Sequence, residues 1–434
     1  MTTIVWFRQD LRLEDNPALA AAAAAGPVVP VYVWAPHEEG AWPPGAASRW
    51  WLHRSLAALD ERLRAAGSRL IVRRGDSLEV LAGLQRELGG AGVVWNRRYE
   101  PAAIARDAEV KRSLAGRSHS ASLLHEPWTV TSRSGGPFQV FTPFWRRLLE
   151  LGEPDPPAPA PRLTPPPAWP ESLPLEDLGL LPDRDWAAGF DDIWTPGERG
   201  AAAELDRFAA GAAGYADVRD LPAHAGSRLS PHLHLGEIGP RQVWASVRLA
   251  AGTAAEPYLR QLGWREFANH LLYHHPDLPE RPLRTAFERF PWRQAPGDLA
   301  AWQRGRTGYP LVDAGMHELW QTGFMHNRVR MVAASFLTKH LLIDWREGAR
   351  WFWDTLVDAD LANNTMGWQW VAGSGADAAP YFRIFNPAAQ ADRYDADGDY
   401  RRRWLAGAPA MPPLVEHAAV RERALAAYAT IRSN

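Results

Sequence analysis

The pattern of apolar and polar positions divides the chain into two parts of different character. In residues 3–130, short apolar runs rich in β-branched residues alternate with helical segments closed by glycine, such as 48–66 and 78–88. Strands that alternate with helices predict βαβ units and a doubly wound parallel sheet. The predicted strands are Ile4–Phe7, Val28–Trp34, Arg69–Arg73, Gly92–Trp95 and, from a weaker pattern, Ala121–His125.

From residue 196 onward the apolar residues recur at the i, i+3 and i+4 spacing of helices, with glycine or proline at the ends of segments. This pattern predicts an all-helical second part, and we expect its loops to carry most of the unusual residues. The predicted helices cover 197–212, 240–252, 256–274, 311–323, 327–342 and 348–357.

Residues 152–182, between the two parts, are rich in proline. Proline has no backbone N–H and a fixed φ, so this segment is expected to be an extended connector and not a helix or a strand. The sequence therefore predicts an α/β domain over residues 1–130, a connector over 131–195 and a helical domain over 196–434.

Composition narrows the possible functions. The 434 residues contain 22 tryptophans and no cysteine, and their formal net charge is −2. The lack of cysteine excludes disulfides, thiolate metal sites and iron–sulfur clusters, and it fits a reducing cytoplasm. Because the net charge is small, a nucleic-acid partner would have to bind a local basic patch. No signal peptide or membrane span is visible, so we expect a cytoplasmic protein that makes no membrane contact; we also expect a monomer.

The most unusual segment is 345–387, which contains five tryptophans and the run Asp358-Ala-Asp360-Leu-Ala-Asn363-Asn364. Indoles stack on other π-systems, and carboxylates and amides can bind the polar edge of a heterocycle. The same run is also compatible with a solvated helix end. A metal site is a third reading, but no histidine or further acid stands at suitable spacing.

The segment Gly226–Ser230 offers backbone N–H groups, two hydroxyls and a guanidinium just before a helix, which suits a phosphate. Its alternative is a plain serine helix cap, and the nearby Tyr215 and Arg219 favour the anion site. His232 and His234 point in different directions on a short helix, so we expect no metal there. The phosphate-cradling GxGxxG pattern does not follow the first strand, which argues against a nicotinamide dinucleotide site.

Several long motifs together resemble one family over essentially the whole chain. They are VWFRQDLRLEDNPAL, GSRLSPHLHLGEIGPRQVW, LGWREFANHLLYHHP, GRTGYPLVDAGMHELWQTGFMHNRVRMVAASFLTKHLLIDWREG and DADLANNTMGWQWVAGSGADAAPYFRIFNP. These segments are similar to the photolyase/cryptochrome flavoproteins, and within them to bacterial cyclobutane pyrimidine dimer photolyases of the class III branch, which is close to the plant cryptochromes. The resemblance implies an α/β antenna domain, a long connector and a helical FAD-binding domain.

The resemblance also implies roles for individual residues. Trp368, Trp345 and Trp292 match an electron relay that runs from the flavin to the surface and serves photoreduction. Asn364 matches the residue that faces flavin N5, where a neutral amide has no proton to give and should favour the fully reduced anionic flavin over the neutral radical. The residues that match the FAD site are Tyr215, Gly226, Ser227, Arg228, Leu229, Ser230, Arg265, Asn327, Arg330, Asp358, Asp360 and Asn364.

For the lesion, the resemblance implies an aromatic wedge around a flipped pyrimidine dimer and arginines on the flanking phosphates. Stacking is worth about 1–3 kcal/mol per base, and a damaged step costs less to unstack. The matching lesion- and DNA-binding residues are Gln261, Trp264, Asn327, Arg328, Met331, Trp370, Arg219 and Arg383.

Two positions bear on which lesion is repaired. Photolyases for (6-4) products carry histidines at the positions of Asn327 and Met331, so this sequence favours the cyclobutane dimer. Gln261 is a departure, because cyclobutane-dimer photolyases usually have glutamate there. An amide can donate to thymine carbonyls but cannot stabilise a developing charge as an acid could.

The resemblance thus implies a light-driven lyase in which reduced FAD lends an electron to a pyrimidine dimer in UV-damaged DNA, the cyclobutane bonds split and the electron returns. A methenyltetrahydrofolate antenna in or beside the first domain is expected, and no metal. The rival functions are a cryptochrome-type blue-light photoreceptor, a (6-4) photolyase and a flavin electron carrier. Asn364 and the chain end soon after YFRIFNP favour repair over photoreception.

Overall fold

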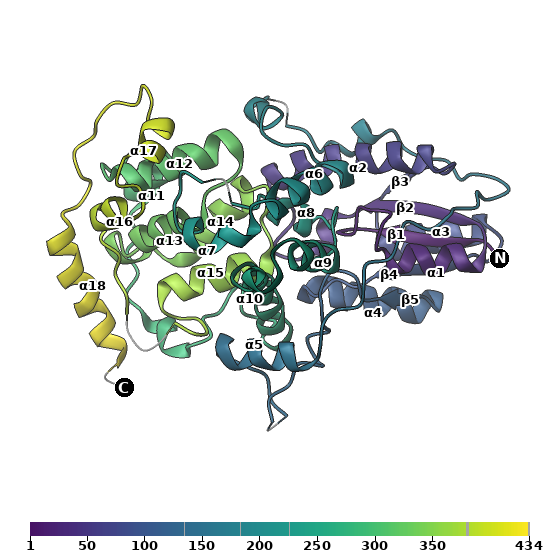
Figure 1. The fold of residues 1–434 in the computed structure, drawn as a ribbon, viewed down its shortest axis with the longest axis horizontal. Helices are drawn as coiled ribbons and strands as arrows, with labels where there is room; N and C mark the ends of the chain where they lie inside the picture. Colours follow the sequence, from purple (N-terminus) through teal and green to yellow (C-terminus); the bar gives the residue numbers. More distant parts are fainter. Residues whose placement is uncertain (134, 183, 225, 379–381, 433–434) are drawn as a thin grey trace.

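A computed structural model describes residues 1–133, 135–182, 184–224, 226–378 and 382–432. The α/β half lies at one end of the molecule and the helical half at the other (Figure 1). The sheet is parallel throughout, with strand order β3-β2-β1-β4-β5. Its elements are β1 (Thr3–Phe7), α1 (Pro17–Ala25), β2 (Val28–Trp34), α2 (Ala46–Ala65), β3 (Ile71–Arg74), α3 (Ser77–Glu87), β4 (Gly92–Asn96), α4 (Pro101–Leu114) and β5 (Arg117–His119).

Both faces of the sheet are covered by helices, which explains why β1 and β2 are buried at every position. Ile4 and Trp6 of β1 enter one hydrophobic cluster, whereas Val5 and Phe7 enter another. Alternate side chains of a strand point to opposite faces, so the two clusters are the two layers of a doubly wound domain. This fold class was predicted from the sequence and is confirmed.

The weakest predicted strand, Ala121–His125, is wrong: the fifth strand is β5, and residues 121–125 are irregular. A buried carboxylate of the helical half binds this segment instead. Glu266 Oε2 accepts the N–H groups of Leu124 (3.0 Å) and His125 (3.2 Å). A side chain distant in sequence therefore supplies the hydrogen bonds that a neighbouring strand would have supplied.

The proline-rich connector runs along the α/β half as an extended chain. The carbonyls of Ala158 and Thr164 accept the N–H groups of Asp15 and Val28 (2.8 and 2.9 Å). Before it, α5 (Phe141–Glu150) packs against the helical half, on α10 (Glu256–His274). The division of the chain into domains at residues 130 and 195 stays a prediction.

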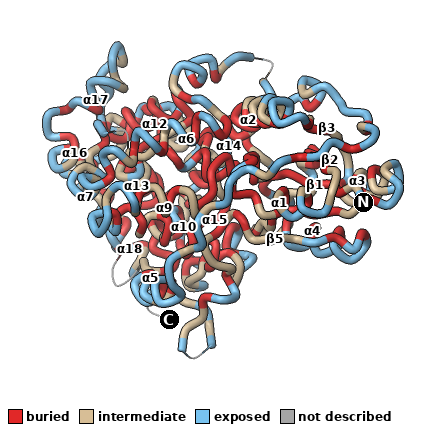
Figure 2. The backbone as a smooth tube through the Cα atoms, turned by 45° about the vertical axis from the view of Figure 1, so that its right-hand side comes forward, coloured by how far each residue is buried: buried red, intermediate tan, exposed pale blue. Residues whose placement is uncertain are grey.

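The second half is helical, and the five strands that the structure describes all lie before residue 120. Its helices surround the largest hydrophobic cluster, and the buried segments occupy the interior of both halves (Figure 2). The remaining helices are α6 (Glu198–Ala209), α7 (Tyr215–Val218), α8 (Ser230–His234), α9 (Pro240–Ala251), α11 (Pro296–Gln303), α12 (Pro310–Thr322), α13 (Asn327–Ser335), α14 (Trp345–Thr355), α15 (Leu361–Ala372), α16 (Pro387–Tyr394), α17 (Asp399–Trp404) and α18 (His417–Arg432).

Several helices were not predicted, and one of them, α15, carries candidate site residues. Asn363, Asn364, Trp368 and Trp370 lie on α15, a segment for which the sequence analysis predicts no helix. Asp360 caps this helix by accepting the N–H of Asn363 at 2.8 Å. The helix begins directly after a tight turn. Asp358 lies in this turn and Asp360 at the start of the helix, and the two amides lie in the first turn of the helix. None of the described helices is both long and apolar enough to cross a membrane.

Candidate functional site

The loop at Gly226–Ser230 meets the turn between α14 and α15 through one carboxylate. Ser230 Oγ donates to Asp358 Oδ2 (2.6 Å), and Arg330 Nη2 donates to both oxygens of Asp358 (3.0 and 2.9 Å). Gly226 and Arg228 both have positive φ, which turns the loop sharply before α8. Three segments distant in sequence are thereby joined, as the resemblance implied for residues of one site.

The start of α15 carries a second carboxylate and an amide. Burial raises the pKa of the Asp360 carboxyl, but the neighbouring His234 imidazole and Arg265 guanidinium outweigh it and hold the pKa well below its usual range. Asp360 is therefore ionised at neutral pH. The side chain of Asn364 is oriented by its Nδ2, which donates to the Ala349 carbonyl of α14 at 3.0 Å.

These residues have the properties of a lined ligand site. Ser230 and Asn327 are exposed and Asn364 is partly so, although Leu229, Ala359 and other neighbours in the chain are buried. Polar side chains that stay accessible between buried neighbours are typical of residues that line a pocket. The donor set of hydroxyls, guanidinium groups, carboxylates and amides fits a pyrophosphate and a polar heterocycle.

Two residues assigned to this site, Tyr215 and Arg265, also contact residues outside it. Tyr215 packs edge-on against Phe208 and Tyr258, with ring centroids 5.8 and 5.2 Å away. Arg265 Nη1 donates to the carbonyl of Ser122 at 2.5 Å, in the irregular segment of the α/β half. Arg265 thus reaches both Asp360 and the first domain.

The three tryptophans predicted to form a relay differ in burial. Trp368 and Trp345 are buried, 2% and 1% exposed, whereas Trp292 is half-buried. Trp368 packs on α14 at Gly348, where a Cβ would overlap its ring. Gly348 lies one turn after Trp345 on the same helix, so Trp368 contacts α14 on the side that Trp345 occupies.

Most of the residues predicted to bind the lesion lie on α10, α13 and α15. The Trp264 ring stacks on Phe141, with ring centroids 3.7 Å apart. Asn327 Nδ2 lies 3.9 Å from Met331 Sδ, and Gln261 donates to its own helix at the Pro257 carbonyl (3.2 Å). Trp370 is half-buried and packs against the main hydrophobic cluster.

The expected phosphate-binding arginines differ in their contacts. Arg328 pairs with Asp220 at 2.8 Å and lies over the Tyr394 ring, and Arg219 lies 3.9 Å from the same carboxylate. Arg383 is exposed. Asp220 therefore reduces the local positive charge of two arginines that would contact DNA.

A separate cavity of about 280 Å³ lies between the two halves. Its walls include Trp34 at the carboxyl end of β2, and Trp42 and Trp353 from the two sides of the interface. Trp42 Nε1 donates to Glu280 at 2.9 Å, and its ring meets Trp353 edge-on. Ligands of open α/β sheets bind outside the carboxyl ends of the strands, which is where this cavity lies.

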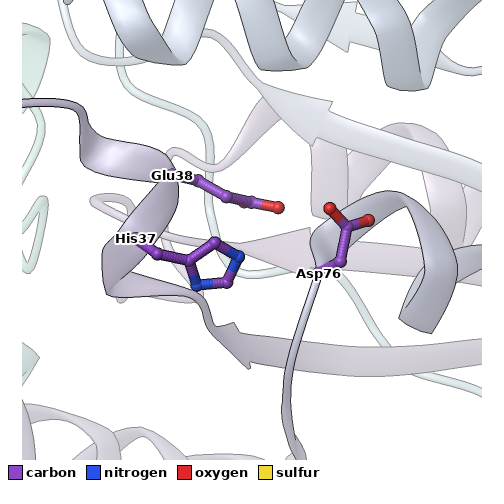
Figure 3. A group of neighbouring side chains, drawn as sticks. All are labelled: His37, Glu38 and Asp76. Carbon is purple, nitrogen blue, oxygen red and sulfur yellow. The ribbon is translucent and has the colours of Figure 1, made fainter.

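Among the described residues, one group has the spacing of a metal site: His37, Glu38 and Asp76, whose ligand atoms lie within 4.8 Å of one another (Figure 3). Glu38 already accepts the N–H and hydroxyl of Ser77 (2.7 and 2.5 Å), and Asp76 caps α3. Arg106 lies 3.8 Å from Glu38. These contacts account for the arrangement, and we assign no metal to it.

Each half of the molecule matches a known protein family model. Residues 3–162 match the family model described as DNA photolyase, and residues 258–429 match that described as the FAD binding domain of DNA photolyase. The chain belongs to the DNA photolyase family. FAD is accordingly the cofactor of its helical domain, and the donor set described above fits that group.

Individual photolyase relatives extend over the full chain. The deoxyribodipyrimidine photo-lyase of Agrobacterium fabrum is 50% identical over 99% of this chain and 98% of its own length. The crystal structure of a bacterial class III photolyase from Agrobacterium tumefaciens matches with a TM-score of 0.95 at 49% identity, covering 100% of this chain and 98% of that one. Cryptochrome-1 of Arabidopsis thaliana is 41% identical over 93% of this chain, which spans 62% of the cryptochrome.

The sequence analysis of this photolyase-family chain missed three residues that pack against or bind candidate site residues and the 121–125 segment. They are Phe141, Gly348 and Glu266. A glycine inside a helical pattern signals close packing, so Gly348 could have been found. Phe141 and Glu266 carry no local signal, because each acts on a partner that is distant in sequence.

Glu266 gives one testable consequence. Burial raises its pKa to about 7, against the opposing effects of Arg265 and the N–H groups of Leu124 and His125. The unfolded chain releases this proton near pH 4.5, so between pH 4.5 and 7 the folded state alone holds it and stability falls as pH rises. The loss amounts to about 3 kcal/mol for a shift of this size.

A Glu266→Gln variant keeps an acceptor for both N–H groups but has no proton to lose. The free energy of unfolding of both proteins is measured by urea denaturation at several pH values. Between pH 5 and pH 8 the wild type should lose stability relative to the variant. An equal pH slope in both proteins would contradict this account.

Proposed function

We propose that this protein is a light-driven deoxyribodipyrimidine photo-lyase that splits cyclobutane pyrimidine dimers in UV-damaged DNA. The observation that carries the proposal is the similarity to a photo-lyase of that name over 99% of this chain and 98% of the relative. Bound FAD, when reduced and excited by blue light, would supply the electron that opens the dimer. The chain's own residues bind the cofactor, present the lesion and connect both to the surface.

The cofactor would be held by the joined loops of the site. The Gly226–Ser230 loop and Arg330 supply hydroxyl and guanidinium groups for the phosphates, and Asp358, Asp360 and Asn364 supply acceptors and an amide for the heterocycle. Because Asp360 stays ionised and Asn364 is a neutral amide, no acidic proton stands at the start of α15 at neutral pH.

The lesion would be bound by Trp264 and Trp370 as an aromatic wedge, with Met331, Asn327 and Gln261 beside it. The arginines at 219, 328 and 383 would contact the flanking phosphates, so that affinity for damaged DNA falls as salt rises. Gln261 would donate from its amide to a thymine carbonyl after releasing the Pro257 carbonyl.

Trp368, Trp345 and Trp292 would form the relay that reduces the cofactor in light. A Gly348→Ala variant should push the Trp368 ring off α14, at a cost of about 1–3 kcal/mol for overpacking, and slow photoreduction severalfold. The measurement is the rate of flavin bleaching under blue light with an external reductant.

Gly367→Ala is the matched control, because Gly367 precedes Trp368 on α15 and a Cβ there would meet nothing within 4 Å. It should photoreduce at the wild-type rate. Equal rates in wild type and Gly348→Ala would remove the argument that Gly348 seats the indole.

An antenna chromophore of the folate type, methenyltetrahydrofolate, would bind in the cavity between the two halves, where tryptophans can stack on a pterin ring. We further propose a cytoplasmic monomer with the domain division at residues 130 and 195, consistent with a chain that lacks cysteine.

One assay separates this function from its rivals. The purified, chemically reduced protein is irradiated with blue light in the presence of oligonucleotides that contain either a cyclobutane thymine dimer or a (6-4) product, with a dark sample as control. We expect restoration of the cyclobutane substrate only, in light only. Restoration of the (6-4) substrate would assign the other repair activity, and restoration of neither would favour a photoreceptor.

A further inference from the structure

The ring of Trp264 is covered on one face by a residue from a different helix. Phe141, the first residue of α5, lies parallel to Trp264 of α10, with ring centroids 3.7 Å apart and planes 7° apart. Phe141 is 1% exposed, whereas Trp264 is half-buried. A DNA base can therefore stack only on the opposite face of the indole.

A second ring supports Phe141 from behind. Trp145, one turn later on α5, lies 6.3 Å from Phe141 with planes 14° apart, so the three rings are nearly parallel. Gly263 allows this arrangement, because a Cβ there would overlap the Trp145 ring. Helix α5 is thus held closely against α10, next to the residue that would stack on the lesion.

Two neighbours on α10 pack against the Phe141 ring, Arg260 over its face and Phe267 nearly edge-on. The Arg260 guanidinium lies 5.1 Å from the ring centroid, and the Phe267 ring meets Phe141 nearly edge-on at 5.9 Å. Phe267 also meets Trp264 edge-on, at 5.9 Å. The orientation of both stacked rings is therefore fixed by packing before any DNA arrives.

We propose that Phe141 is a positioning residue for lesion binding, which holds the Trp264 indole so that its free face is presented to the dimer. This inference rests on the proposed function. An indole whose rotamer is already fixed loses less conformational entropy when a base stacks on it, and the stacked geometry is present before binding. A helix of the connector would in this way contribute to the affinity of a site built on the helical half.

The test compares Phe141→Leu with Phe144→Leu. Phe144 is on the same helix and equally buried, but its ring contacts Phe267 and His270 and not Trp264. Binding is measured by fluorescence anisotropy on a labelled oligonucleotide with one cyclobutane thymine dimer and on the same oligonucleotide undamaged. FAD content and photoreduction are measured in parallel.

Phe141→Leu should weaken binding of the damaged oligonucleotide by about 5- to 10-fold, which corresponds to the loss of an aromatic pair. Undamaged DNA binding, FAD content and photoreduction should stay at wild-type values, and Phe144→Leu should change none of the four. Phe141→Tyr keeps the stacked ring and should bind damaged DNA as the wild type does. If Phe141→Leu does not fold, Phe141→Met fills the same space with a flexible chain and carries the same expectation.

A double variant shows whether the effect passes through the indole. In a Trp264→Ala background, Phe141→Leu should cause no further loss. Equal losses in the two leucine variants, or a full additional loss without Trp264, would overturn the proposal. If the wild type itself does not prefer damaged DNA, the proposed function fails and this inference with it; if the wild type does and Phe141→Leu does too, only this inference fails.

Discussion

Replacing Trp368 with phenylalanine is expected to abolish light-driven reduction of the bound cofactor while leaving repair intact after chemical reduction. Trp368 is 2% exposed and packs on α14 at Gly348, one turn after Trp345, and the predicted relay places its indole next to the flavin. A phenyl ring fills most of the same space but is much harder to oxidise. The measurement is flavin absorbance under blue light, followed by a dimer-splitting assay on dithionite-reduced protein.

Trp302→Phe is the matched control for this variant. Trp302 is fully buried and meets Trp368 edge-on at 6.1 Å, but it lies outside the predicted relay. Its indole donates to the Ala333 carbonyl at 3.0 Å, so the variant should lose about 1 kcal/mol of stability and keep photoreduction. Loss of photoreduction in both variants, or loss of repair in chemically reduced Trp368→Phe, would contradict the relay assignment.

The second large effect is expected at Asp358. Its carboxylate, 5% exposed, accepts from Ser230 and pairs with Arg330, which is 23% exposed. Removing one partner of such a pair costs about 3–5 kcal/mol, because the other charge is left uncompensated. Asp358→Ala should therefore weaken FAD binding by about 100- to 1000-fold, if most of this cost falls on the assembled site. Equilibrium dialysis of the apoprotein against FAD measures it.

Asp395→Ala provides the comparison. Asp395 is 2% exposed and pairs at 2.8 Å with Arg401, which is 27% exposed, so the burial of this pair is similar to that of Asp358 and Arg330. It lies outside the residues assigned to the cofactor. This variant should lose stability but bind FAD with nearly wild-type affinity. Equal weakening of FAD binding in both variants would show that general destabilisation, and not the site, is being measured.

The fold class could be predicted because both of its signals are local. Runs such as Val28–Trp34 are apolar at every position, as a strand buried on both faces requires, and the later segments repeat with the period of a helix. The error at Ala121–His125 has the opposite cause. That run has the composition of a strand, but its N–H groups bind the side chain of Glu266, which no local pattern reveals.

In the candidate site, too, the local features could be predicted and the contacts between distant residues could not. Residue types in Gly226–Ser230 and in the Asp358–Asn364 run indicated a phosphate and a heterocycle, because donors and acceptors of those kinds suit such ligands wherever they lie. The sequence could not show that Ser230 and Arg330 both bind Asp358, because the three residues belong to segments far apart in the chain. Helix α15, which carries the two amides, was not predicted, although Asp360 caps it by accepting the N–H of Asn363.

The sequence by itself determined the alternation of strands and helices in the first half, the helical character of the second, the lack of thiol chemistry and the residue types available to a flavin and a damaged base. Each of these depends on nearest neighbours or on composition. Only the tertiary structure decided that Phe141 covers Trp264, that Gly348 seats Trp368 and that His234 and Arg265 keep Asp360 ionised. Those arrangements depend on short-range forces between groups far apart in the chain, and such forces act only after the fold has brought the groups together.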